Sequence, residues 1–129
     1  MVRVTARHRH DGSVLDDAVS SATGHFIAQR VTAIALVLLG LWFVAMTTGF
    51  DSFEYVIVVA FIAKPLNGVL LTLLCAILAY HSHLGVQVVI DDYVHAARLH
   101  EVSMIVSRIA HLAVAAVSIY AVIQIGAGA

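Results

Sequence analysis

Three long stretches of the chain contain no Asp, Glu, Lys or Arg, and they determine the predicted fold. They cover residues 31–50, 65–90 and 109–129. Each is at least as long as the ~20 residues that an α-helix needs to cross the hydrocarbon core of a bilayer. We therefore predict an all-α integral membrane protein with three transmembrane helices, over about 28–49, 65–94 and 103–126.

A fourth apolar run, residues 55–63, lies between Glu54 and Lys64 and is too short to cross a membrane. We expect an interfacial segment or a helical extension there. The residues before the first span are polar, so we divide the chain into a polar N-terminal extension, 1–25, and a three-helix membrane domain, 26–129. The extension mixes arginine with aspartate and has no apolar core, which fits neither a secretory signal nor a transit peptide.

Composition agrees with a membrane protein, because 61% of the 129 residues are apolar and only 12% are charged. Cys75 is the only cysteine, which excludes an internal disulfide and a thiolate metal cluster. The sequence contains no glycine-rich phosphate loop and no Ser/His/Asp arrangement for a soluble substrate. We expect no nucleic-acid partner, and any soluble catalysis would have to come from other subunits.

The basic residues predict the orientation in the membrane. Arginines precede the first span and lie between the second and third spans: Arg3, Arg7, Arg9, Arg30, Arg98 and Arg108. Segments rich in Lys and Arg remain on the cytoplasmic side. The N-terminus is therefore expected in the cytoplasm and the C-terminus outside, in a bacterial inner membrane, with the mitochondrial inner membrane as the alternative.

Two histidines lie near the middle of the second predicted span. Counting ~1.5 Å per residue from Tyr93 at its cytoplasmic end, His81 lies about 18 Å and His83 about 15 Å inside. Ionisable residues at such depth are functional candidates by default. At ~100° per residue the two side chains leave the helix about 200° apart, so one ligand is not expected to use both.

The His81 face continues through Gly85 to Asp92, which combines an imidazole, a notch without a side chain and a carboxylate at the water boundary. Two interpretations follow. A neutral imidazole beside a bare glycine suits a haem iron and its flat porphyrin. Alternatively, the histidine bonds to a neighbouring helix and the glycine permits close packing. The structural interpretation is preferred for His83 and His111, and the role of His25 stays open.

A six-coordinate haem needs a second axial ligand at the depth of His81. Counting along the helices places His25 and His111 near cytoplasmic ends, so we expect the second ligand to come from another polypeptide. Two other classes of function remain. One is a proton or solute transport component that uses His81, His83 and Asp92 as a relay. The other is a self-sufficient dihaem carrier, which would need more histidines at matched depths.

The pattern His81, Gly85 and Asp92-Tyr93, together with HFIAQRVTAIAL (25–36) at the start of the first span, resembles the hydrophobic membrane anchor subunits of succinate dehydrogenase. The resemblance covers nearly the whole chain after the polar N-terminus. It implies half of a two-subunit helical bundle that shares one haem b with a cytochrome b subunit. An iron-sulfur subunit and a flavoprotein subunit would dock on the cytoplasmic or matrix side.

The resemblance also implies roles for single residues. His81 corresponds to the axial haem ligand, and Gly85 to the notch beside it. Arg30 corresponds to an arginine near the haem propionates and the quinone pocket. Tyr93 corresponds to the tyrosine that hydrogen-bonds a ubiquinone carbonyl, and Asp92 to its acidic neighbour.

The implied function is electron transfer from succinate to ubiquinone in the respiratory chain and the tricarboxylic acid cycle. The chain would act as a membrane subunit without flavin, and succinate would be oxidised on another subunit. A fumarate reductase anchor is the nearest alternative, because the same architecture serves both directions.

Overall fold

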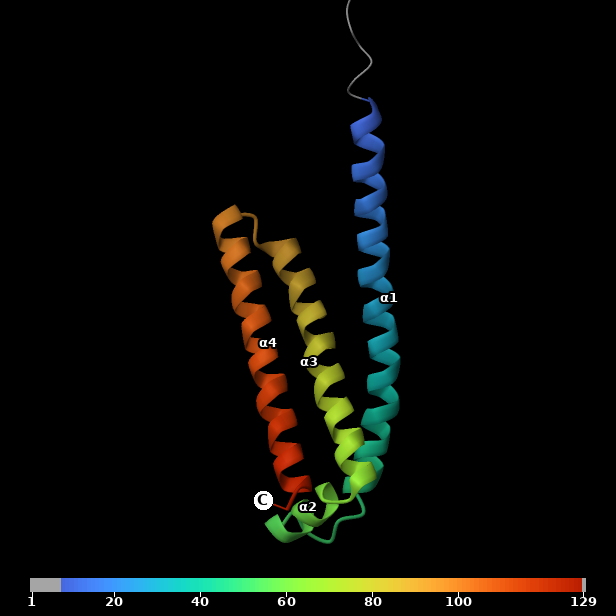
Figure 1. The fold of residues 1–129 in the computed structure, drawn as a ribbon, viewed down its shortest axis with the longest axis vertical. Helices are drawn as coiled ribbons and strands as arrows, with labels where there is room; N and C mark the ends of the chain where they lie inside the picture. The colour runs from blue at the N-terminus through green and yellow to red at the C-terminus, as the bar shows by residue number, and fades with distance from the viewer. Residues whose placement is uncertain (1–7, 129) are drawn as a thin grey trace, which may run out of the picture.

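The computed structural model describes residues 8–128 as four helices: α1 (His8–Thr47), α2 (Tyr55–Ile62), α3 (Pro65–Tyr93) and α4 (Ala97–Gly126) (Figure 1). No strand occurs among these residues. Helices α1, α3 and α4 each contain a segment long and apolar enough to cross a membrane. The predicted all-α fold with three membrane-spanning helices is therefore confirmed.

Two helices begin earlier than their apolar spans. Helix α1 begins at His8, not near 28, so it runs without a break across the predicted boundary at 25. Helix α4 begins at Ala97, not near 103. Hydropathy locates only the part of a helix that suits hydrocarbon. Charged residues such as Arg98 and Glu101 lie outside that part, but they still favour a helical backbone. The N-terminal part of α1 extends past the ends of α3 and α4 (Figure 1).

The short apolar run forms a separate helix, α2 (Tyr55–Ile62), and is not an extension of α1 or α3. Phe61 of α2 is buried, stacks on Trp42 of α1 at 6.1 Å between ring centroids and meets Phe50 edge-on at 5.2 Å. Asn67 of α3 donates from Nδ2 to the Phe61 carbonyl oxygen at 2.9 Å. These contacts hold α2 against α1 and α3 at one end of the molecule.

The turn between α2 and α3 depends on two residues with special backbone properties. Pro65 occupies the first turn of α3, where its missing N–H would have had no helical partner. Gly68 lies so close to the end of α2 that a Cβ there would meet the Ile62 carbonyl oxygen at 3.3 Å. Glycine therefore allows the two helices to approach at this point.

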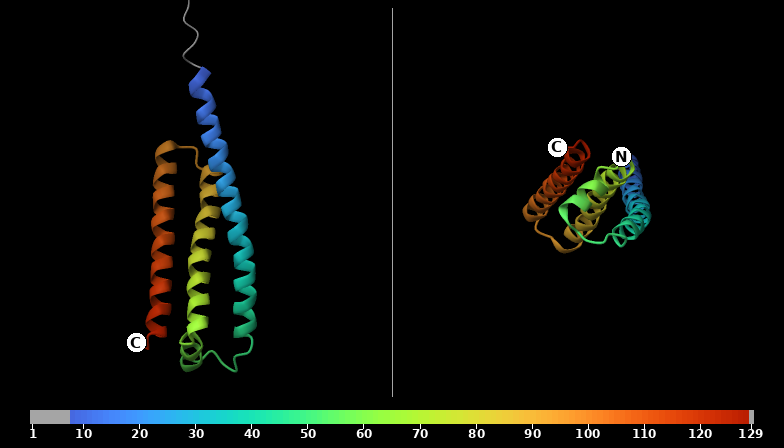
Figure 2. Two further views of the ribbon diagram at one scale, coloured as in Figure 1. Left: turned by 45° about the vertical axis from the view of Figure 1, so that its right-hand side comes forward. Right: turned by 90° about the horizontal axis from the view of Figure 1, so that it is seen from below.

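Helix α3 lies between α1 and α4 and packs on both, whereas the backbones of α1 and α4 do not approach each other (Figure 2). The three long helices form an open row instead of a closed bundle. Few side chains in the described residues are buried: Phe61, Leu71, Leu84, Ile90, Asn67 and Ser107. Apolar surface of this extent requires a cover of lipid or of other subunits.

Candidate functional site

His81 lies on the side of α3 that faces α1. Its Nδ1 is 2.8 Å from the hydroxyl oxygen of Thr32, a residue of α1, and the imidazole is half-buried. Among the side chains that the structure describes, residues 14–128, no hydrogen bond engages the other ring nitrogen, Nε2. The ring is thus held at one nitrogen and keeps the other for a group outside the described chain.

Gly85 lies one turn further along α3, on the same side as His81. Apart from its chain neighbours and the adjacent backbone of α3, no described atom would come within 4 Å of a Cβ built on Gly85. The alternative that this glycine allows a neighbouring helix of the same chain to pack closely is therefore not supported. The notch expected beside His81 is open.

His83 lies on the other side of α3 and faces α4. Its ring centroid is 5.4 Å from that of His111, and its Nδ1 is 3.5 Å from the hydroxyl of the buried Ser107. Both ring nitrogens of His111 are engaged: Nδ1 lies 2.7 Å from the Ser107 carbonyl oxygen, and Nε2 lies 3.1 Å from the Ser82 hydroxyl. Interhelical bonds of this kind favour the structural interpretation of both histidines.

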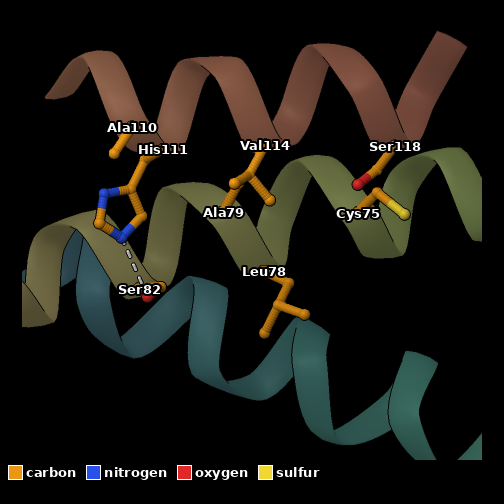
Figure 3. A pocket seen from close by; sticks show the side chains of 8 residues that line it. All are labelled: Cys75, Leu78, Ala79, Ser82, Ala110, His111, Val114 and Ser118. Atoms are coloured by element: carbon orange, nitrogen blue, oxygen red, sulfur yellow. Dashed lines mark hydrogen bonds between the residues drawn. The ribbon is translucent and has the colours of Figure 1, made fainter. Parts of the chain in front are cut away.

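The expectation that His111 lies shallow, near the cytoplasmic end of its helix, was wrong. The antiparallel packing of α4 on α3 places His111 beside Ser82, next in sequence to His81 (Figure 3). Depth had been counted from Arg108, but a long arginine side chain can extend to the interface from well inside a span. His111 offers no free ring nitrogen, and His83 faces α4, so neither imidazole lies on the α1 side of α3 with His81.

A cavity of about 460 Å³ lies along the seam between α3 and α4, close to this histidine pair (Figure 3). His111 and Ser82 line one end, and Cys75 and Ser118 line the other. None of the residues predicted to bind haem or quinone lines this cavity. In the described chain the His81 side of α3 and this seam are therefore separate.

Two further residues of α1, Arg30 and His25, form no hydrogen bond with His81 among the described residues. The Arg30 guanidinium lies 4.6 Å above the centre of the Phe26 ring, a cation–π contact on an exposed part of the helix. Arg30 is about 200° around α1 from Thr32, so it leaves the helix away from His81. His25 has a buried Nε2 with no hydrogen-bond partner among the described residues. A buried polar atom of this kind requires a partner from outside the chain.

Asp92 and Tyr93 form the last turn of α3, and both are exposed. The Tyr93 side chain is free for a partner, since the residue is 78% exposed. Asp91, the acidic residue before Asp92, pairs with His100 Nε2 at 2.8 Å. That pair links the end of α3 to the first turns of α4 and leaves Asp92 available beside Tyr93.

Sequence reasoning missed the polar residues that bond these histidines, Thr32, Ser82 and Ser107, and it also missed the pairing of His100 with Asp91. Hydroxyl groups inside a predicted span are a usable signal, because such groups bond across helices in membranes. The described residues bring no group of three His, Cys, Asp or Glu side chains together as a metal site. A haem iron shared between two subunits needs only one ligand from each.

An open row of three helices, each long and apolar enough to cross a membrane, defines an integral membrane protein of the helical class. The sequence model of the succinate dehydrogenase/fumarate reductase transmembrane subunit family matches residues 7–125. The chain belongs to this family.

Its relatives place it with the hydrophobic membrane anchor subunits of succinate dehydrogenase. The chain is 34% identical over 92 residues to that subunit of Rickettsia felis, covering 71% of this chain and 77% of the relative. It is 34% identical over 94 residues to the subunit of Rickettsia bellii, covering 71% and 74%. It is 32% identical over 89 residues to that of Rickettsia prowazekii, covering 69% and 71%.

Proposed function

We propose that this membrane anchor subunit holds one haem b together with a cytochrome b subunit and forms part of a ubiquinone reduction site. In this proposal it passes electrons from succinate oxidation to ubiquinone. The observation that carries the proposal is the free Nε2 of His81, beside the open notch at Gly85, on a helix row that other subunits must complete.

The residues around His81 suit the axial position of a haem. A ligating histidine normally donates its other ring N–H to a fixed acceptor, which orients the ring. Thr32 is in place to accept from Nδ1 of His81, and the space at Gly85 lets a flat macrocycle approach the backbone. Haem bound there supplies one-electron transfer. His111 is bonded at both nitrogens and His83 faces α4, so in our proposal the second iron ligand comes from the partner subunit.

In our proposal Arg30 acts near the haem propionates and the quinone pocket, from the side of α1 that points away from Thr32. Its guanidinium can bind a propionate carboxylate through two parallel hydrogen bonds. The cation–π contact with Phe26 leaves those donors available. His25, with its unpartnered Nε2 on the same helix, is a further donor or acceptor for a group supplied at assembly.

The quinone site is proposed at the end of α3. The Tyr93 phenol donates a hydrogen bond to a ubiquinone carbonyl oxygen, and Asp92 relays protons from the aqueous side. Reduction of a quinone to a quinol consumes two electrons and two protons, so a proton path at the water boundary is a chemical requirement. Both side chains are exposed and Asp91 is occupied by His100, which leaves Asp92 for this role.

We further propose that the N-terminus is cytoplasmic and that the membrane is a bacterial inner membrane, as the arginine distribution predicts. The end of α1 that extends past α3 and α4 would then lie on the side of the iron-sulfur and flavoprotein subunits. The relatives named above are bacterial proteins and are described as succinate dehydrogenase subunits, which favours succinate oxidation over fumarate reduction.

A transport function is less consistent with the contacts. A relay would need His81, His83 and Asp92 to be linked, but His81 bonds to α1 and His83 faces α4. No hydrogen bond within residues 8–128 connects either histidine to Asp92.

The test of the proposed function is a dithionite-reduced minus oxidised absorption spectrum of the purified assembly. We expect the bands of a b-type haem. A colourless assembly with intact succinate oxidation would contradict the haem proposal and would favour the transport alternative.

A further inference from the structure

We propose that Thr32 is a positioning residue for His81. Its hydroxyl oxygen holds the proton of the imidazole on Nδ1, keeps the Nε2 electron pair free for iron and increases electron donation by the ring. The inference rests on the proposed haem role of His81. Through Thr32, α1 would directly influence the redox potential of the haem whose ligand, His81, is carried by α3.

The direction of the hydrogen bond follows from the surroundings of the Thr32 hydroxyl. The oxygen lies 2.8 Å from the Ala28 carbonyl oxygen and 3.1 Å from that of Gln29. Carbonyl oxygens only accept, and a hydroxyl has one proton, which must therefore point toward these two atoms. The side of the oxygen that faces His81 Nδ1 at 2.8 Å is a lone pair.

His81 must then be the donor in this contact. If Nδ1 were unprotonated, two lone pairs would oppose each other at 2.8 Å inside a membrane span, where an unmade hydrogen bond is costly. A neutral imidazole with its proton on Nδ1 has its electron pair on Nε2. The free nitrogen of His81 is thus in the form that a metal ligand requires.

The contact also fixes the orientation of the ring. Thr32 is anchored to its own helix by the Ala28 carbonyl, and a β-branched side chain in a helix has few rotamers. The bond from His81 crosses from α3 to α1, so the imidazole plane is tied to the packing of two helices. A hydroxyl that already donates to a carbonyl is polarised and accepts more strongly.

An N–H···O bond from the distal nitrogen raises the basicity of a ligating histidine. A more basic ligand stabilises ferric over ferrous iron, which lowers the haem potential. Removing the acceptor is therefore expected to raise the potential. Thr32 is the residue of this chain that is placed to tune the haem potential through His81, because it forms the one hydrogen bond of the His81 ring among the described side chains.

The test is a redox titration of the b-type haem in the assembled complex that carries Thr32→Val. Valine keeps the shape of the side chain and loses the acceptor. At a fixed ambient potential near the midpoint, we expect the ratio of reduced to oxidised haem to rise several-fold and up to tenfold, where tenfold is about 59 mV for a one-electron couple. Thr32→Ser retains the hydroxyl and its carbonyl bond, so it is expected to restore the wild-type potential.

Thr72→Val is the matched control. Thr72 lies on α3, is half-buried, and donates to the Gly68 carbonyl oxygen at 2.8 Å without contacting a histidine. Its substitution removes the same group from the same kind of environment, and the haem potential is expected to stay at the wild-type value.

The outcomes separate this inference from the proposed function. A b-type spectrum in every variant with an unchanged potential in Thr32→Val would overturn the role of Thr32 and leave the haem proposal standing. A shift in Thr32→Val that serine does not restore would also overturn it, as would an equal shift in Thr72→Val. If Thr32→Val loses haem, retention in Thr32→Ser supports the inference, and loss in both overturns it. Absence of haem from the wild-type assembly would overturn the inference together with its premise.

Discussion

The imidazoles of His83 and His111 face each other across the α3–α4 seam with 5.4 Å between their ring centroids. Ser107 and Ser82 engage the same pair, so four polar side chains meet where the two helices pack. His81, separated from His83 by a single residue, bonds instead to Thr32 on the opposite neighbour of α3. The two histidines of the HSH sequence therefore serve different helices.

This division leads to opposite expectations for two alanine variants. His81→Ala is expected to remove or strongly perturb the b-type spectrum, because it deletes the nitrogen that is free for iron. His83→Ala is expected to leave the bands nearly intact. Reduced-minus-oxidised spectra of the two purified assemblies, normalised to flavin, measure the difference. Normal haem in the His81 variant and lost haem in the His83 variant would reverse the assignment.

The α3–α4 seam should contribute to stability and not to electron transfer. Ser82→Ala removes one interhelical hydrogen bond, for which about 0.6 kcal/mol is typical in membranes. His111→Ala removes bonds at both ring nitrogens and should cost more, about 1–3 kcal/mol. Thermal unfolding of the assembly in detergent measures both.

Ser118→Ala provides the control for this series. Ser118 lines the same seam cavity but makes no side-chain hydrogen bond within the described residues. Its substitution should leave the unfolding temperature at the wild-type value. A loss for Ser118→Ala equal to that for Ser82→Ala would mean that the hydrogen bond with His111 contributes nothing.

The chain expressed alone should not hold a six-coordinate haem. His81 provides one free nitrogen on the α1 side of α3, whereas His111 is bonded at both nitrogens and His83 points to the opposite side, toward α4. Reconstitution of the isolated chain in detergent, followed by absorption spectroscopy at several protein concentrations, tests this expectation. A bis-histidine spectrum from monomeric protein would show that a second ligand is available within the chain.

Tyr93→Phe should separate the quinone site from the rest of the assembly. The substitution keeps the ring and removes only the hydroxyl, so a hydrogen bond worth about 0.5–1.5 kcal/mol is lost from quinone binding. The rate falls further if the phenol also assists protonation. We expect lower ubiquinone reduction, with an unchanged haem spectrum and unchanged succinate oxidation by an artificial dye.

The pair of assays distinguishes the possible roles of Tyr93. A parallel fall in dye and quinone activity would mean that the tyrosine holds the soluble subunits in place. Unchanged activity in both assays would mean that the proposed quinone role does not apply to this chain.

The number of spans was predictable because hydrocarbon thickness and charge distribution constrain it directly. The start of α1 was not, since a helix continues through polar residues until something stops it, and no proline precedes Pro65. The separate directions of His81 and His83 followed from helical geometry. Their partners did not, because Thr32 and Ser107 are brought to them by packing between helices that sequence spacing does not encode. The same limitation caused the error in the depth of His111.

The length of α1 has a mechanical consequence. It contains 40 residues, so at ~1.5 Å per residue it is about 60 Å long, roughly twice the thickness of the hydrocarbon core. A substantial part of this helix must therefore lie outside the hydrocarbon core, in the headgroup layer and the water beyond it. Any subunit that binds its outer part is kept at a constant height above the membrane. Each residue inserted into α1 between its outer part and Thr32 would move that subunit by ~1.5 Å and turn it by ~100° relative to Thr32 and His81.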